Sequence, residues 1–276
     1  MNEILLTFFA SLEKHTGISL DINKKYLIDS RLSPIAKENG FKEVKDLLLH
    51  LNKNSLGGLH YKAFDALTTN ETMFFRDPHV FEALRTKILP ELIRARSKKK
   101  NLRIWSAASS TGQEAYSIAI MLSEMIPDLQ DWDIQIVGTD FSERALNKAK
   151  EGVYNHFELS RGLDKHFAEK YFGPVRSDGT RQANSKIREI VKFSLINLVD
   201  SWPSLPYFDI VFLRNVLIYF TQDTKDKVLN RVSKLMGPAD GILILGASEM
   251  IPLSTQFKMV QLEKISYYKV VLGEGA

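Results

Sequence analysis

The sequence of 276 residues contains no cysteine. This excludes disulfide bonds, metal sites with cysteine ligands and catalytic thiols, and it favours a reducing, intracellular setting. Long apolar runs are also missing, because the opening run 4–10 is too short to span a bilayer and the run 210–220 is interrupted by Arg214 and Asn215. The six histidines lack the spacing of metal ligands. We therefore expect a cytoplasmic protein that is not inserted in a membrane and binds no metal.

Strong net charge is absent as well. The formal charge is +4, and the excess lies in residues 76–101, which carry eight basic and three acidic side chains. The last cations of this segment form one run, Arg94, Arg96, Lys98, Lys99 and Lys100. Such a run either attracts nucleic acid or complements the dipole at the end of a helix. The second interpretation is preferred, so no nucleic-acid partner is expected.

The apolar pattern divides the chain near residue 100. Residues 1–76 show only helical periodicity and predict an N-terminal helical domain. Residues 77–101 predict a bridging helix and basic linker, with Asp77 as the N-cap and Pro78 at the first position of a helix over 78–97.

Residues 102–276 predict an α/β domain. Short apolar runs alternate with helical patterns, as in a parallel sheet wound with helices. The expected strands are 102–107, 134–139, 208–213, 241–246, 257–262 and 266–271, with helices opened by Ser142 and over 222–236. Residues 153–190 are polar and rich in turn signals, which indicates an inserted subdomain.

Informative residues follow the expected strands, where wound sheets bind ligands. The small residues 106–112 let a ligand approach the backbone, although they lack the glycine spacing of dinucleotide and P-loop motifs. Asp140 stands where an acidic residue commonly binds ribose hydroxyls, or else it begins the next helix. Arg214 and Asn215 interrupt an apolar segment, and such a charge faces a cleft or forms a salt bridge in the core. The pattern favours an adenosine-containing ligand.

Four segments together resemble the chemotaxis receptor methyltransferases, the CheR family. The segment 103–119, RIWSAASSTGQEAYSIA, is closely similar to this family. The others are 68–76 (TTNETMFFR), Asn197-Leu198 and 212–220 (FLRNVLIYF), all in the family's order. The resemblance implies a Rossmann-like class I methyltransferase domain with a small inserted β subdomain behind an all-helical N-terminal domain.

The resemblance also implies the activity and its residues. It implies methyl transfer from S-adenosylmethionine to receptor glutamates, giving methyl esters in chemotaxis adaptation. The implied cofactor-binding residues are Asn70, Thr72, Arg76, Glu114, Asp140, Asn197, Leu198, Arg214 and Asn215. Arg76 and Tyr219 are implied to lie nearest the transferred methyl group. The expected partners are methyl-accepting chemotaxis receptors, through which a monomer reaches the membrane arrays.

Receptor docking is expected on the helical domain, through Lys24, Lys25 and Arg31, because receptor methylation regions are glutamate-rich helices in this family. Strand addition of a receptor tail to the insert is an alternative, and the untethered mode is preferred. Two other functions stay open. One is a CheR-like methyltransferase with another protein or a small acid as substrate, and the other is a non-catalytic signalling adaptor that binds S-adenosylmethionine. A nucleic-acid base methyltransferase is disfavoured, because the sequence has no Pro-Pro dipeptide for an NPPY-type motif.

Overall fold

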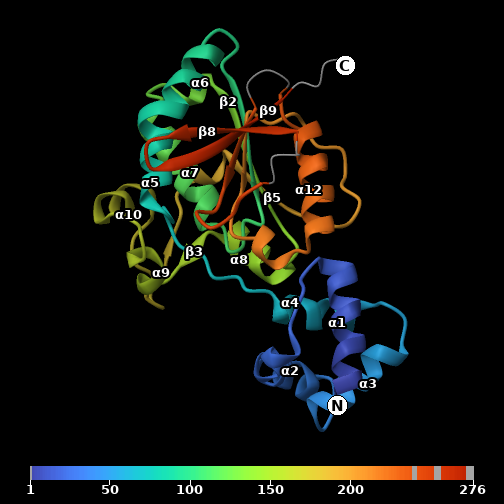
Figure 1. The fold of residues 1–276 in the computed structure, drawn as a ribbon. Helices are drawn as coiled ribbons and strands as arrows, with labels where there is room; N and C mark the ends of the chain where they lie inside the picture. The colour runs from blue at the N-terminus through green and yellow to red at the C-terminus, as the bar shows by residue number, and fades with distance from the viewer. Residues whose placement is uncertain (1, 238–240, 252–255, 272–276) are drawn as a thin grey trace. The chain divides into compact units, whose positions relative to one another are not determined.

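The computed structural model describes residues 2–237, 241–251 and 256–271, and the chain forms two units (Figure 1). The smaller unit comprises Met1–Thr69, Asn197–Trp202 and Ile218–Val228, and the larger one comprises the remaining segments, 70–196, 203–217 and 229–276. Residues 70–76, which the sequence placed in the helical domain, thus belong to the larger unit. Within the described ranges, no helix is long and apolar enough to cross a membrane.

The smaller unit is helical. Its main elements are α1 (Asn2–Thr16), the 3-10 turn η1 (Ile22–Lys24), α2 (Lys25–Glu38), α3 (Val44–Lys53) and α4 (Gly58–Leu67). Apolar side chains at helical spacing bury one face of each long helix, as Phe8 and Leu12 do in α1. The ring of Phe8 lies 5.7 Å from that of Phe64 in α4. The helical domain expected from the sequence is confirmed.

The loop after α1 packs against the later segments of the same unit. Gly17 has a φ of +75°, and a Cβ there would lie 2.7 Å from Val199 and 2.9 Å from Phe220. Glycine is therefore needed for both its conformation and its lack of a side chain. The backbone N–H of Ser19 donates to the carbonyl of Tyr219 over 3.0 Å. Tyr219 ends the short 3-10 helix η4 (Leu217–Tyr219).

The larger unit contains a seven-stranded sheet in the order β5-β2-β1-β6-β7-β9-β8. The strands are β1 (Asn101–Ala107), β2 (Asp133–Asp140), β5 (Val191–Leu195), β6 (Ile210–Leu213), β7 (Ile242–Leu245), β8 (Phe257–Leu262) and β9 (Ile265–Val270). The first five in the spatial order are parallel, and β9 is antiparallel to both of its neighbours. The expected Rossmann-like arrangement is confirmed.

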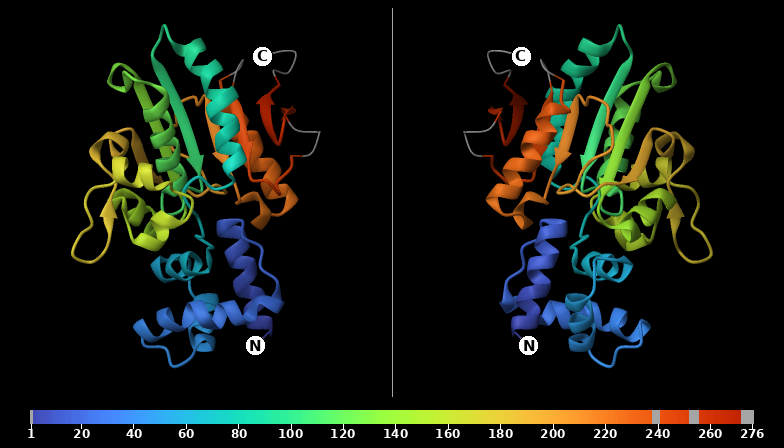
Figure 2. Two further views of the ribbon diagram at one scale, coloured as in Figure 1. Left: turned by 90° about the vertical axis from the view of Figure 1, so that its left-hand side faces the viewer. Right: turned by 90° about the vertical axis from the view of Figure 1, so that its right-hand side faces the viewer.

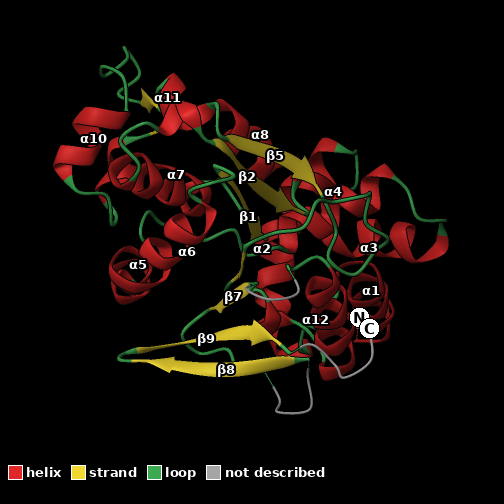
Figure 3. Ribbon diagram, turned by 90° about the horizontal axis from the view of Figure 1, so that it is seen from above, coloured by secondary structure: helices red, strands yellow, loops and turns green. Residues whose placement is uncertain are grey.

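The central strands are apolar on both faces because helices cover both. Ile104 and Ile136 belong to the core cluster that includes residues of α7 (Gln113–Met125), and Trp105 faces the other way and stacks on Phe208 at 5.4 Å. Figure 3 shows α5 (Pro78–Ala83), α6 (Leu89–Arg96) and α7 on one face. Buried residues of α12 (Gln222–Lys234) such as Val232 belong to the other layer. Near-continuous apolar runs are typical of such parallel strands.

The helix expected over 78–97 contains a π-helical turn, η2 (Leu84–Ile88), between α5 and α6. Leu89 donates its N–H to the carbonyl of Leu84, five residues back. Pro90 explains the wider turn, because it has no N–H to donate and its ring crowds the carbonyl four residues earlier. Ser142 begins α8 (Glu143–Glu151) as expected, since its side chain accepts a hydrogen bond from the N–H of Ala145.

The insert 153–190 is small and partly helical. It contains the two-stranded antiparallel sheet of β3 (Val153–Tyr154) and β4 (Arg181–Gln182), with α9 (His156–Ser160), α10 (Lys165–Tyr171) and α11 (Ser185–Arg188). Figure 2 shows it in yellow beside the β5 edge of the sheet. Tyr154, Phe172 and Ile187 are buried in the same core cluster as α7. The insert therefore shares the core of the larger unit.

Candidate functional site

The parallel strands β1, β2, β6 and β7 end at one edge of the sheet, so the loops that follow them meet there. These loops hold most of the residues that the sequence predicted for the site in the larger unit. Segment 70–77 contributes the others. This segment contacts the loop after β1, because the carbonyl of Asn70 accepts a hydrogen bond from the hydroxyl of Ser110 at 2.9 Å.

The loop after β1 has an unusual backbone. Ala108, Ser110 and Gly112 have φ values of 59°, 50° and 93°. A Cβ on Gly112 would lie 2.9 Å from Ala149. The hydroxyl of Tyr154 donates to the carbonyl of Thr111 over 2.6 Å and fixes the loop from the core side. Within the loop, the N–H of Ser109 donates to the carbonyl of Thr139 at 2.8 Å, and the N–H of Gly112 donates to the carbonyl of Ser109 at 3.0 Å.

Two buried tyrosines, one bonded to this loop and one to α8, act as neutral donors. Burial raises the pKa of Tyr116 to about 12, and burial, followed by the charge of nearby groups, raises the pKa of Tyr154 well above its usual value. Tyr116 donates its hydroxyl to the carbonyl of Ala149 over 2.9 Å. Both hydroxyls therefore keep their protons at neutral pH.

Asp140 ends β2 and joins two loops. The carboxylate is buried, and its Oδ2 accepts the N–H of Ser110 at 2.8 Å while its Oδ1 accepts the N–H of Ser142 at 2.8 Å. Ser142 itself caps the following helix, so Asp140 does more than begin α8.

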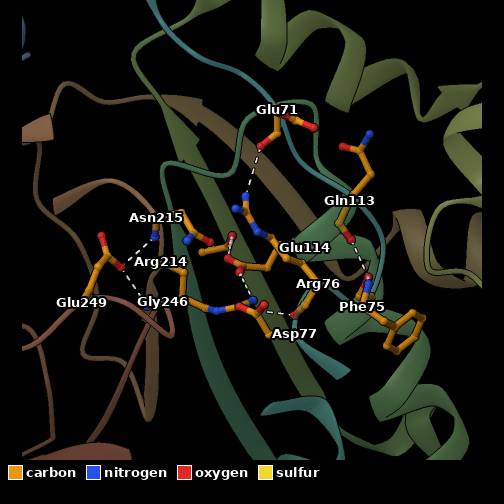
Figure 4. Close-up of polar contacts among 12 residues, drawn as sticks. Glu71, Phe75, Arg76, Asp77, Gln113, Glu114, Arg214, Asn215, Gly246 and Glu249 are labelled. Atoms are coloured by element: carbon orange, nitrogen blue, oxygen red, sulfur yellow. Dashed lines mark hydrogen bonds and ion pairs between the residues drawn. The ribbon is translucent and has the colours of Figure 1, made fainter. Parts of the chain in front are cut away.

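Arg214 lies in a buried ionic cluster at the end of β6 (Figure 4). Its side chain is 2% exposed; Nη1 donates to Glu114 Oε2 at 2.9 Å, and Nη2 donates to Asp77 Oδ2 at 2.6 Å. Nη2 also donates to the carbonyl of Arg76 at 2.9 Å. Glu114 accepts a further bond from the hydroxyl of Ser106 at 2.7 Å. The core salt bridge, one of the two alternatives for Arg214, is thus present.

Asp77 differs from the sequence expectation. It occupies the N-cap position of α5, but its φ is 60° and its side chain makes no cap hydrogen bond. The physical reason is the ion pair, because the carboxylate that would cap the helix is directed to Arg214 instead.

Arg76 is fixed along its backbone. Phe75 before it and Asp77 after it both have positive φ, at 47° and 60°. The N–H of Phe75 donates to the hydroxyl of Ser117 at 2.9 Å, and the Arg76 carbonyl accepts from Arg214. Within the described part of the chain, the half-buried Arg76 side chain makes one hydrogen bond, from Nη1 to the carbonyl of Glu71 at 3.2 Å.

Backbone strain gathers in these segments. Among the described residues, seven non-glycine residues have positive φ, and five of them lie here, namely Phe75, Asp77, Ala108, Ser110 and Asn215. Such conformations cost of order 1–3 kcal/mol each and persist where the surrounding structure fixes them, which is commonly at functional sites.

Glu249 is a site residue that the sequence analysis missed. Its buried Oε2 accepts the N–H of Asn215 at 2.7 Å and the N–H of Gly246 at 2.8 Å. A Cβ on Gly246 would lie 2.7 Å from this oxygen and 2.8 Å from Asn215 Nδ2. Glu249 thus ties the ends of β6 and β7 together. A glycine after a buried strand with a carboxylate three residues later was the available signal.

The remaining predicted residues divide between the units. Thr72 is half-buried in segment 70–77 of the larger unit, where the side-chain amide of Asn70 donates to Ser142 Oγ at 3.4 Å. In the smaller unit, Asn197 donates from Nδ2 to the carbonyl of His15 at 2.6 Å, and Leu198 is buried.

The predicted docking residues have unequal surroundings. Nη1 of Arg31 donates to the carbonyls of Leu67 and Thr68, at 2.8 and 3.0 Å, and so satisfies the C-terminal end of α4. Lys25 is exposed. The side chain of Lys24 lies outside the described part of the structure.

Over the described ranges, no group of three or more carboxylate or imidazole side chains is placed to hold a metal ion.

Two family models match the chain. The all-alpha domain of CheR methyltransferases matches residues 5–68, and the SAM-binding domain of CheR methyltransferases matches residues 70–266. The junction between them agrees with the division of the chain after Thr69.

Curated relatives match over most of their length. Chemotaxis protein methyltransferase Cher2 of Pseudomonas putida is 41% identical over 92% of this chain and 93% of its own. Chemotaxis protein methyltransferase 1 of Vibrio cholerae is 39% identical over 95% of each chain. Among solved structures, PKMT2 of Rickettsia typhi in complex with AdoHcy has a TM-score of 0.34 at 18% identity, covering 53% of this chain and 21% of that one. The family models and the curated relatives establish that this chain belongs to the CheR methyltransferase family.

Proposed function

We propose that the protein transfers the methyl group of S-adenosylmethionine to glutamate side-chain carboxylates of chemoreceptor cytoplasmic helices. The relatives' names give chemotaxis as the setting. The observation that carries the glutamate specificity is Arg76, whose backbone is fixed on both sides while its guanidinium makes a single hydrogen bond to the described residues. A guanidinium held in this way is suited to a forked pair of hydrogen bonds with a carboxylate.

The carboxylates of the candidate site fit S-adenosylmethionine. This cofactor has a ribose diol, an ammonium group and a cationic sulfonium. Carboxylates accept hydrogen bonds from the first two and attract the charge of the third. Asp140 is at the end of β2, where ribose hydroxyls are bound in wound sheets, and Glu114 is at the start of α7 beside the loop of small residues. When bound, the cofactor supplies an activated methyl group.

The chain's own residues need only position the substrate. A glutamate side chain is already ionised at neutral pH, so no strong general base is required. We assign Arg76 to orient the substrate carboxylate and the Tyr219 hydroxyl to steer its other oxygen or the methyl group. Alignment of reacting groups lowers a barrier by at most roughly 7–11 kcal/mol. Asn70, Thr72, Asn197, Leu198 and Asn215 complete the proposed cofactor set.

The proposed partners are methyl-accepting chemotaxis receptors. We propose a cytoplasmic monomer, without nucleic-acid or metal ligands, that reaches membrane arrays through the receptors. Lys25 is the most direct probe of docking on the helical unit, because Arg31 also satisfies carbonyls of α4. Binding of a receptor tail to the insert remains the alternative mode.

Asp140→Ala is expected to weaken S-adenosylhomocysteine binding by about 1–3 kcal/mol, the cost of losing a charged hydrogen-bond acceptor. Isothermal titration calorimetry measures the change. Asp178→Ala is the control, because Asp178 is an exposed carboxylate of the insert that bonds to Thr180. Equal affinities for wild type and Asp140→Ala would limit Asp140 to joining the two loops.

A transfer assay with S-adenosylmethionine labelled in its methyl group tests the proposed function. Purified receptor cytoplasmic fragments should gain label, and fragments with glutamine at the accepting glutamates should not. Label on a different protein would identify another substrate. Binding of the cofactor with no transfer to any protein would favour a non-catalytic adaptor.

A further inference from the structure

Asp77 has a conformation that its position in the helix does not require. At an N-cap, an aspartate ordinarily has extended backbone and accepts an N–H of the first turn. Here its φ is 60° and no side-chain cap bond forms. Its carboxylate instead makes the shortest of the bonds to Arg214, at 2.6 Å, with 26% of the Asp77 side chain exposed. Asp77 thus lacks the stabilising N-cap hydrogen bond and forms an ion pair with Arg214 from a strained, left-handed backbone.

The ion pair between Asp77 and Arg214 and the backbone of Arg76 share one nitrogen atom of Arg214. Nη2 of Arg214 donates both to the Asp77 carboxylate and to the Arg76 carbonyl. Asp77 is therefore one of the groups that fix this nitrogen, and the nitrogen in turn holds the Arg76 carbonyl. Glu114 holds the other nitrogen, Nη1, from the opposite side of the cluster. The Arg214 guanidinium is thus oriented at two points (Figure 4).

The rest of segment 70–77 holds Arg76 from its other side. Phe74 is fully buried, with its ring 5.2 Å from Tyr154 and 5.6 Å from Phe172. The Phe75 N–H is bound by Ser117. On the C-terminal side of Arg76, the Arg76 carbonyl and the Asp77 carboxylate both accept hydrogen bonds from Arg214, and the Asp77 carbonyl accepts the N–H of Val80 at 2.8 Å. Loss of the Asp77 carboxylate would therefore remove one of the two carboxylates that orient Arg214 and loosen the C-terminal side of Arg76, while the contacts on its N-terminal side stay in place.

We propose that Asp77 is a positioning residue for Arg76 and acts through Arg214. This inference rests on the proposed role of Arg76 as the group that orients the substrate carboxylate. Asp77 itself touches neither substrate nor cofactor. Its ion pair with Arg214 fixes the Arg76 carbonyl, and with it the point from which the Arg76 side chain reaches the substrate. A displacement of about 1 Å in a positioning group lowers turnover by about 100-fold.

Two substitutions separate this role from backbone strain. Asp77→Gly removes the carboxylate, and glycine adopts positive φ without cost. Asp77→Asn keeps a side-chain oxygen and a residue that tolerates the left-handed region, and it removes only the charge. Turnover should therefore fall in the order wild type, Asp77→Asn, Asp77→Gly.

Asp209→Asn is the matched control. Asp209 pairs with Arg96 in the same unit at 2.7 Å, and its side chain is 13% exposed. It accepts a backbone N–H, from Arg103, and lies outside the candidate site. A merely structural role for Asp77 would make its substitution resemble Asp209→Asn, with lower thermal stability and unchanged turnover per folded molecule.

The experiment measures kcat and KM for a receptor fragment, the dissociation constant of S-adenosylhomocysteine and the thermal midpoint of each variant. We expect kcat to fall about 10- to 100-fold in Asp77→Gly and less in Asp77→Asn, with the dissociation constant changed less than about threefold. If kcat in Asp77→Gly stays within twofold of Asp209→Asn, or falls only in step with cofactor affinity, the inference is wrong. Wild-type activity shows separately whether the proposed function holds.

A crystal structure of Asp77→Gly gives a readout that needs no activity. The inference predicts that the Arg76 carbonyl moves away from Arg214 and that the Arg76 Cα shifts by about 1 Å relative to Glu114. An unmoved Arg76 would overturn the inference, even if the wild-type protein methylated no receptor.

Discussion

Arg214→Ala is expected to lower the free energy of unfolding by about 3–5 kcal/mol, because it leaves two carboxylates without the cation they share. The Arg214 side chain is 2% exposed and the Glu114 side chain 13% exposed, so water cannot replace the lost partner fully. Urea unfolding followed by tryptophan fluorescence measures the change.

A triple variant and a surface control identify the cause of that loss. Adding Asp77→Asn and Glu114→Gln to Arg214→Ala should recover part of the stability, since no unpaired charge then remains. Arg85→Ala removes an arginine whose ion pair with Glu82 is about equally exposed on both sides, at 59% and 58%, and should cost at most about 1 kcal/mol. A loss in Arg214→Ala no larger than in Arg85→Ala would contradict a structural role for the buried cluster.

Arg76→Ala is expected to lower the rate of methyl transfer by about 100-fold or more, the usual effect of removing an oriented donor from an active centre. The fold should persist, because the contacts that fix this segment use the Arg76 backbone and its neighbours. Tyr219→Phe, which removes one hydroxyl, should also lower turnover. Calorimetry with S-adenosylhomocysteine shows whether cofactor binding survives in each variant.

Arg161→Ala is the control for Arg76→Ala. Arg161 is a half-buried cation of the same unit that pairs with the exposed Glu71 at 2.9 Å, so its loss changes the local charge without removing Arg76. Transfer by Arg161→Ala should stay near the wild-type rate. If Arg76→Ala and Tyr219→Phe both transferred methyl groups as fast as wild type, the assignment of the active centre would be wrong.

Local patterns predicted the elements well where one physical signal dominated. The apolar runs of β1 and β2 and the cap at Ser142 lie within a residue or two of their expected places. The π turn at 84–88 was missed because Pro90 changes hydrogen bonding without changing the apolar stripe. In the insert, the sequence showed few apolar residues, and those few complete a core built mainly by other segments.

The predicted site could not be completed from the sequence for a different reason. Arg214 and Glu114 are 100 positions apart, and Asp77 and Arg214 are 137 apart, so no local pattern pairs them. The same holds for Glu249, which binds backbone groups of two strands. The resemblance named the residues of the proposed site, whereas the three-dimensional structure shows which carboxylates contact Arg214 and the backbone around it.

The most direct test of the account is mass spectrometry of a chemoreceptor cytoplasmic fragment after incubation with this protein and S-adenosylmethionine. We expect methyl esters on glutamate side chains of the helical region, removable by mild alkali and absent when Arg76→Ala replaces the wild-type protein for a short incubation. Methylation at any other side chain, or esters formed as readily by Arg76→Ala, would contradict it.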